Sequence, residues 1–170
     1  MSSFKDIYRN HWKHTSNKEL LVKALFEMWG FEVSKFGYMA ASTEYNPNGS
    51  PDVGKPDWKV EGRGLGSFYV EVTGTFSMPD SYYIRPDKLR WAADHSNEPS
   101  YCAFVASDTG EIVFIPMWRV IPFIDHQIKT DAYGKQETFT EIPAPISSER
   151  FRRFLFHEST PRLTIGDFTK

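Results

Sequence analysis

The sequence has one cysteine, no apolar run long enough to span a membrane and no surplus of positive charge. A single cysteine can form neither an internal disulfide nor a thiolate metal site, which is typical of a reducing compartment. Its position in the apolar run YCAFVA predicts that Cys102 is a core residue. The amino-terminal stretch MSSFKDIYRNHWKH lacks the apolar centre of a secretory signal. We therefore expect a cytoplasmic protein with no membrane segment.

Several classes of functional site also lack their patterns. The formal net charge of −2 weighs against a protein that coats nucleic acid, because such binding needs many cations facing phosphates. The five histidines are scattered without ligand spacing, which argues against a zinc site. The glycine-rich GRGLGS lies between two strand-like segments rather than before a helix, which argues against a nucleotide cofactor.

What is present indicates one mixed domain. A chain of 170 residues with 40% hydrophobic content buries one substantial core, so we expect a single domain over residues 1–170. The spacing from Ser16 to Glu19 is that of a capping box and predicts the start of a helix that ends at Gly30. Its expected apolar stripe consists of Leu20, Leu21, Ala24, Leu25, Met28 and Trp29.

The remaining segments alternate between strand and helix patterns. We expect a strand over 31–36, a polar loop over 41–55, a helix from about Pro86 to His95, and strands YCAFVA and EIVFIP joined by the turn SDTG. After Pro116 the pattern weakens: MWRVIPFID is ambiguous, GKQETFTEIP indicates a strand or hairpin, and SSERFRRFLFHES indicates a short helix. The predicted order is helix, three strands, helix, two strands, then an appendage over 117–170, an α/β fold with one central sheet.

The stretch PDWKVEGRGLGSFYVEVTG contains the strongest candidate site. DWKV and FYVEVT are separated by Gly62, Gly64 and Gly66, which predicts a hairpin. A turn centred on Gly64 would place Asp57 directly opposite Glu71, with Thr73 on the same face as Glu71. Like charges opposite each other destabilise a sheet, so this arrangement calls for a compensating cation.

These residues resemble the PD-(D/E)XK nuclease superfamily, and especially its archaeal-type Holliday junction resolvase branch. The resemblance covers residues 16–116: the element order is similar, Pro56-Asp57 and Glu71-Val72-Thr73 stand where the signature is expected, and KELLVKALFEMWGFEV is similar to the opening helix. The resemblance implies a restriction-endonuclease-like core with a mixed sheet flanked by helices. The sequence departs from the family at one position of the signature: Thr73 stands where the family has a lysine that orients the attacking water.

The resemblance further implies which residues would act. Asp57, Glu71 and the main-chain carbonyl of Val72 would hold Mg²⁺ or Mn²⁺, and Glu19 would contribute through water. Lys88, in the helix beginning at Pro86, is the first candidate for the displaced lysine; Lys55 is the second, and Lys59 is less favoured. Thr73 retains a weaker hydrogen-bonding role. Nucleic-acid contacts would come from Arg85, Lys88, Arg90 and Lys55.

Each assignment has a plainer competitor. The capping box explains Glu19, a strand start explains Asp57, and an exposed helix explains Lys88 without any catalysis. The resemblance favours a metal-dependent endonuclease that acts on DNA, specific for branched structures such as Holliday junctions in DNA recombination, and working as a homodimer. The alternative is a nuclease fold that has lost its lysine and binds nucleic acid or a protein partner without cleavage. Docking through the aromatic carboxy-terminal part is a third, weaker interpretation.

Overall fold

The structure is a computed structural model that describes residues 18–37, 54–64, 66–75, 81–106, 112–132 and 135–143. Four expectations lie outside the described residues: most of the polar loop, Ser16 of the capping box, the SDTG turn and the carboxy-terminal helix. Within the described ranges, no helix is long and apolar enough to cross a membrane.

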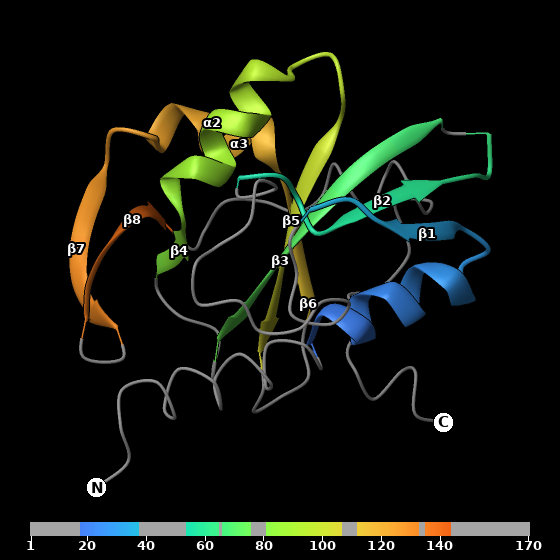
Figure 1. The fold of residues 1–170 in the computed structure, drawn as a ribbon, viewed down its shortest axis with the longest axis horizontal. Helices are drawn as coiled ribbons and strands as arrows, with labels where there is room; N and C mark the ends of the chain where they lie inside the picture. Colours follow the sequence, from blue (N-terminus) through green and yellow to red (C-terminus); the bar gives the residue numbers. More distant parts are fainter. Residues whose placement is uncertain are drawn as a thin grey trace, which may run out of the picture.

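A five-stranded mixed sheet forms the centre of the fold (Figure 1). Its strands, in spatial order, are β1 (Glu32–Lys35), β2 (Trp58–Glu61), β3 (Ser67–Thr75), β5 (Ser100–Ala106) and β6 (Ile112–Pro116). Neighbouring strands are antiparallel except β3 and β5, which run parallel. The parallel pair requires a crossover, which passes through the helix α2 (Pro86–Asp94).

Helices pack on both faces of this sheet, because strand side chains alternate between two buried faces. Residues 18–28 form a helix that covers one face, where Leu25 and Phe26 pack against Val70 and Phe114. On the other face, Leu89 of α2 belongs to a second core built on the central strands. The predicted α/β class with a mixed sheet flanked by helices is confirmed.

The predicted apolar stripe of the first helix is wrong by about one residue of rotation. Val22 and Phe26 are fully buried although neither was in the stripe, whereas Leu20 is 46% exposed and Met28 is 63% exposed. The buried face includes the carboxylate Glu19, which is in line with Val22 and Phe26 on the helix surface. Both stripes contain apolar residues, so hydrophobicity alone does not decide which of them faces the sheet.

A second, three-stranded sheet packs beside α2. Its order is β4 (Ser81–Ile84), β8 (Lys135–Pro143) and β7 (Gln127–Ala132), with both pairs antiparallel. The extra strand expected over GKQETFTEIP is thus present as β8, whereas its hairpin partner β7 and the strand β4 were not predicted. The ambiguous MWRVIPFID forms α3 (Met117–Val120) and the short 3-10 helix η1 (Ile121–Phe123). The buried side chains that join these elements to the α2 core include Met117, Val120 and Ile142.

Candidate active site

The hairpin of β2 and β3 brings two carboxylates together. Trp58 pairs with Val70, the register that a turn centred on Gly64 requires, so that prediction is confirmed. At the preceding residue, a side chain rather than the backbone bonds to β3: Asp57 Oδ2 accepts a hydrogen bond from the Val72 N–H at 2.7 Å. Asp57 therefore lies beside Glu71 on the sheet face that α2 covers.

The backbone of Asp57 is fixed by the end of β1. Its carbonyl oxygen accepts hydrogen bonds from the N–H groups of Phe36 at 3.0 Å and Gly37 at 3.4 Å. A Cβ atom on Gly37 would lie 2.5 Å from the carbonyl oxygen of Pro56 and 2.6 Å from that of Lys55. Only glycine allows this close approach, so Gly37 helps to determine where Asp57 sits.

Burial sets the protonation of both carboxyls. Asp57 is 4% exposed and Glu71 is 8% exposed. Loss of hydration, the largest cause in each case, raises the pKa of Asp57 to about 7 and that of Glu71 to about 8. The negative charge of Glu19 raises the pKa of Asp57 further, the charge of Asp57 raises that of Glu71, and the Lys88 ammonium opposes both shifts.

Lys88 is the cation that faces this pair. Its Nζ lies 3.0 Å from Glu71 Oε2 and donates a hydrogen bond to the Lys55 carbonyl oxygen at 2.7 Å. The Lys88 and Glu71 side chains are 12% and 11% exposed, so water screens the pair weakly. Burial alone would lower the pKa of Lys88, but the carboxylates of Glu71 and Asp57 outweigh it and the pKa is raised. Lys88 is therefore an ammonium ion.

The short ion pair and the raised pKa of Glu71 point in opposite directions, since one implies a carboxylate and the other a neutral acid. A single proton shared between Asp57 and Glu71 satisfies both, because it leaves one negative charge opposite one ammonium.

The carboxylate oxygen Glu71 Oε2 can accept a further partner. It is buried, and the contact that it makes in the described part of the chain is with the Lys88 ammonium. The Lys88 ammonium lies 3.0 Å from it, but a carboxylate oxygen has two lone pairs and can accept a second partner. A buried oxygen in this state is suited to an additional cation.

The other predicted residues lie at different distances from the carboxylates. Glu19 is buried and close enough to shift the pKa of Asp57, and its backbone carbonyl accepts a hydrogen bond from Trp58 Nε1 at 3.0 Å. Thr73 follows on the same strand, with its Oγ1 3.9 Å from the Sγ of Cys102. Cys102 is buried as predicted, and it pairs directly with Glu71 across β3 and β5. Its position beside the carboxylates was not foreseen.

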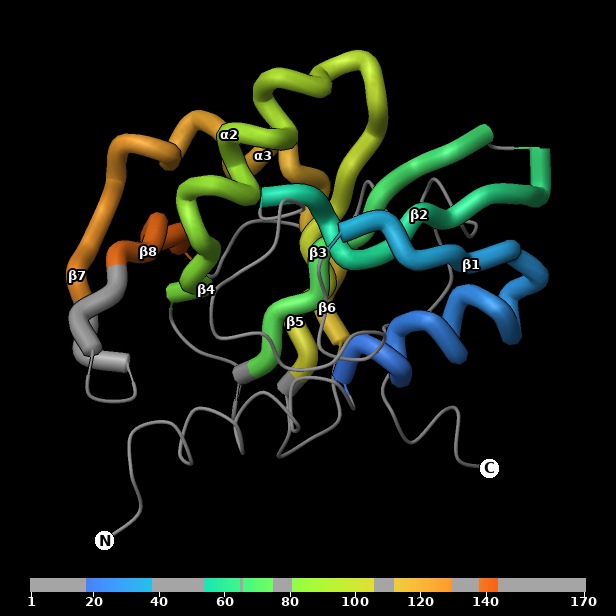
Figure 2. Tube along the Cα trace, in the orientation of Figure 1, coloured from blue at the N-terminus to red at the C-terminus, as the bar shows by residue number. Residues whose placement is uncertain are grey.

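The predicted nucleic-acid contacts divide into two groups. The segment that carries Lys55 runs beside the first turn of α2 (Figure 2), where its carbonyl binds Lys88 and its Nζ lies 5.5 Å above the Phe36 ring. Arg85 is exposed and lies 3.7 Å from Asp87. Arg90 is exposed and follows Lys88 by two residues, about 200° around the helix. The structure therefore brings Lys55 to the site and directs Arg90 away from it.

The described residues fit a divalent cation held by a small number of protein oxygens. They contain no group of three or more histidine, cysteine, aspartate or glutamate side chains arranged to hold a metal. Two adjacent carboxyls are hard oxygen donors, and Mg²⁺ needs only one or two because it keeps several waters. The donor set agrees with Mg²⁺ or Mn²⁺, and the donors do not suit a soft metal.

No family model matches the chain, and no curated protein matches it either. Among solved structures, the chain is similar to a Holliday junction resolvase from Archaeoglobus fulgidus, an archaeal hyperthermophile. The two are 15% identical, and the match covers 75% of this chain and 86% of that chain with a TM-score of 0.44. At this similarity, the roles of the site residues rest on the contacts described above.

Proposed function

We propose that the chain is a metal-dependent endonuclease that hydrolyses phosphodiester bonds in DNA. One observation carries the proposal: Asp57 and Glu71 are buried beside each other, and in the described part of the chain one ammonium, that of Lys88, faces both of them. Burying two carboxyls in contact is unfavourable for folding, which argues that they serve a ligand. The sequence resemblance to PD-(D/E)XK nucleases names the same two residues independently.

Asp57 and Glu71 would hold Mg²⁺ or Mn²⁺, with the Val72 carbonyl as a further donor and Glu19 acting through water. The ion supplies Lewis acidity and lowers the pKa of bound water. The chain itself contributes the other requirements. The Val72 N–H fixes the Asp57 carboxylate, so the donor set is ordered before a ligand arrives.

Lys88 would take the role of the missing motif lysine. Its ammonium lies at the carboxylates although it comes from α2 rather than from β3, and it can offset charge on the scissile phosphate. Its hydrogen bond to the Lys55 carbonyl restrains the side chain. Thr73, partly exposed and next but one to Glu71, would orient a water through its hydroxyl.

A second candidate function is a nuclease fold that binds nucleic acid or a protein partner without cutting. Two observations favour it: Thr73 stands at the lysine position, and Lys88 is already engaged by both Glu71 and the Lys55 carbonyl. An ammonium locked into structural contacts would stabilise the fold and contribute nothing to the reaction. This alternative predicts salt-sensitive binding without cleavage.

Cleavage assays separate the two functions. Purified protein is incubated with Mg²⁺ or Mn²⁺ and labelled linear, flapped and four-way DNAs, and the products are resolved on denaturing gels. The nuclease proposal predicts cutting that is lost in Asp57→Asn and Glu71→Gln. Glu61→Gln is the matched control, because Glu61 is a carboxylate on the same hairpin that pairs with Lys59 and Ser67 away from the site. Absence of cutting on every substrate would favour the binding function.

Four-way junctions belong in the panel because of the sequence resemblance to resolvases. Resolving a symmetric junction requires two cuts, so this substrate class would be accompanied by a homodimer. Light scattering of the protein with and without junction DNA tests the assembly. A monomer that cuts only linear DNA would remove the junction-specific part of the proposal and leave the nuclease intact.

A further inference from the structure

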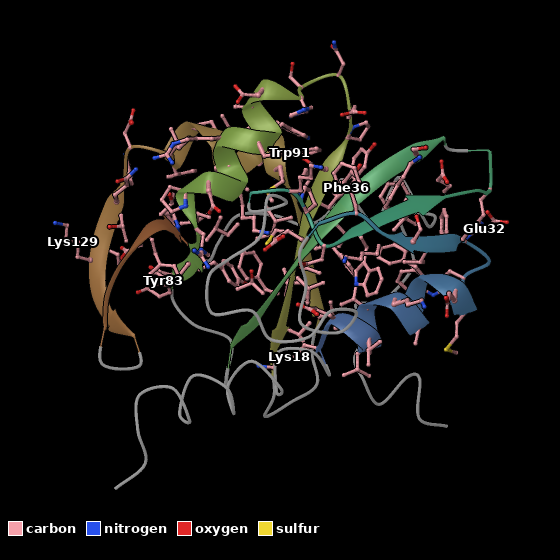
Figure 3. The ribbon with its side chains drawn as sticks, in the orientation of Figure 1. Lys18, Glu32, Phe36, Tyr83, Trp91 and Lys129 are labelled. Carbon is pink, nitrogen blue, oxygen red and sulfur yellow. The ribbon has the colours of Figure 1, made fainter. Side chains whose placement is uncertain are left out.

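A line of aromatic side chains extends from the carboxylate site along α2. Lys88, Trp91 and His95 are spaced by three and four residues, so they lie along one side of the helix. The Trp91 and His95 rings are stacked, with centroids 4.2 Å apart and planes 13° from parallel. Behind the stack, Trp91 meets the edges of Tyr69 at 5.4 Å and Phe36 at 5.5 Å. Figure 3 shows Phe36 and Trp91 side by side.

This aromatic group, Phe36, Tyr69, Trp91 and His95, is held in place from several sides. Phe36 and Tyr69 contact each other with centroids 4.5 Å apart, and the Tyr69 hydroxyl lies 3.2 Å from Glu98 Oε1. His95 Nδ1 lies 2.7 Å from the Trp91 carbonyl oxygen, a hydrogen-bonding distance that fixes the imidazole plane. These rings are ordered before any ligand arrives, which reduces the entropy lost on binding.

The outer face of the group is available. His95 is exposed, and its only ring contact among the described residues is with Trp91 on its inner side. A flat, fixed, solvent-facing ring is suited to stacking with another flat ring. The aromatic group adjoins the carboxylates in two ways. Tyr69 lies two residues before Glu71 on β3, and Lys88, one helical turn before Trp91, is paired with Glu71.

We infer that the Trp91–His95 stack binds an unpaired nucleobase of the strand whose phosphate lies at Asp57 and Glu71. The inference rests on the proposed function and specifies its substrate as single-stranded or locally unpaired DNA. Seven residues separate Lys88 from His95, about 10 Å along the helix axis, so the stacked base would belong to a nucleotide near the scissile phosphate. A base within a duplex is covered on both faces by its neighbours, so it must leave the stack to contact an aromatic ring.

Binding of short oligonucleotides tests the inference without cleavage. Fluorescein-labelled single strands are titrated with metal-free protein in EDTA, and affinity is measured by anisotropy. Three variants are compared: His95→Ala removes the ring, His95→Phe keeps a ring, and His126→Ala is the matched control. His126 is an exposed histidine that meets Phe123 edge-on at 5.5 Å, near the second sheet. A series of strands with one abasic position each locates the stacked base.

His95→Ala should weaken binding about tenfold or more, within the range that base–aromatic stacking provides. His95→Phe and His126→Ala should bind within about twofold of wild type. One abasic position should weaken wild-type binding by a similar factor and remove the difference between wild type and His95→Ala.

Unchanged binding by His95→Ala, with a lowered melting temperature, would show that the stack only closes the helix end and would overturn the inference. A flat abasic series, or undetectable binding of single strands, would overturn it as well. If the stacking inference fails but the protein cuts duplex DNA with a metal ion, the nuclease proposal still holds. Base-dependent binding without any cutting would instead support the stack and reject the nuclease.

Discussion

Replacing Lys88 with methionine tests the electrostatic account of the site. Methionine is a linear apolar side chain of similar length, so packing changes little while the charge is removed. The pair it disrupts has a 3.0 Å separation and two side chains that are about nine-tenths buried. Removing one partner of such a pair costs about 3–5 kcal/mol when the other stays charged.

The cost should depend on pH. At pH 8.5, above the raised pKa values of Asp57 and Glu71, both carboxyls are mostly ionised and lose the Lys88 ammonium that faces them. We expect the free energy of unfolding to fall by about 3–5 kcal/mol there. At pH 5.5 both carboxyls are largely neutral, and the remaining loss is the hydrogen bond to the Lys55 carbonyl, about 0.5–1.5 kcal/mol.

Urea unfolding of metal-free protein at the two pH values measures both costs. Lys23→Met is the control, because Lys23 forms a partly exposed helical pair with Glu27 at 3.6 Å, outside the carboxylate site. Such pairs contribute about 0.3–0.5 kcal/mol, with little change between pH 5.5 and 8.5. A Lys88→Met cost that is equal at both pH values, or no larger than that of Lys23→Met, would refute the reasoning.

Three other predictions concern the same site. The folded pKa values of Asp57 and Glu71 lie above the ordinary values of 3.8 and 4.5, so native protein binds more protons than unfolded protein. Stability of the metal-free protein should therefore fall as pH rises from about 4.5 to 8, and Asp57→Asn should make the slope shallower by about 1.4 kcal/mol per pH unit in urea titrations. Gly37→Ala should lower the free energy of unfolding by about 1–3 kcal/mol, measured by thermal unfolding, because the new Cβ would meet backbone oxygens. Gly74→Ala should lower it less, because there the Cβ would meet the flexible Lys18 side chain, and equal losses would contradict this. Trp58→Phe should cost about 0.5–1.5 kcal/mol by removing the hydrogen bond from its indole Nε1 to the Glu19 carbonyl, and an unchanged melting temperature would count against that hydrogen bond.

Local patterns predicted the part of the site that depends on local structure. Alternation and three glycines determine the hairpin, and the hairpin register alone places Asp57 beside Glu71. Lys88 was ranked ahead of Lys55 on the family resemblance alone, because its reach to the carboxylates depends on how α2 is rotated against the sheet. That rotation follows from the packing of Leu89 and Ala92, which involves strands far along the chain.

Features that depend on contacts between distant segments could not be predicted from local patterns. β4 pairs with β8 through contacts such as Tyr82 with Ile142, about sixty residues apart. A strand of four residues is too short for its alternation to predict it from the sequence. The first helix has apolar residues on two adjacent stripes, and only packing against the sheet shows that Val22 and Phe26 are buried while Leu20 and Met28 are exposed. The aromatic group was missed because Phe36, Tyr69 and Trp91 come from three separate elements and meet only in the folded chain.

The central claim is that Asp57 and Glu71 share a divalent cation, and a Mn²⁺ titration followed by electron paramagnetic resonance tests it most directly. At pH 7.5 the signal of free Mn²⁺ should fall as one ion binds per chain, and Mg²⁺ should compete. Asp57→Asn and Glu71→Gln should each abolish binding, whereas Glu61→Gln should bind as wild type does. Free Mn²⁺ that stays undiminished up to millimolar concentration, or binding that survives both site substitutions, would contradict the account.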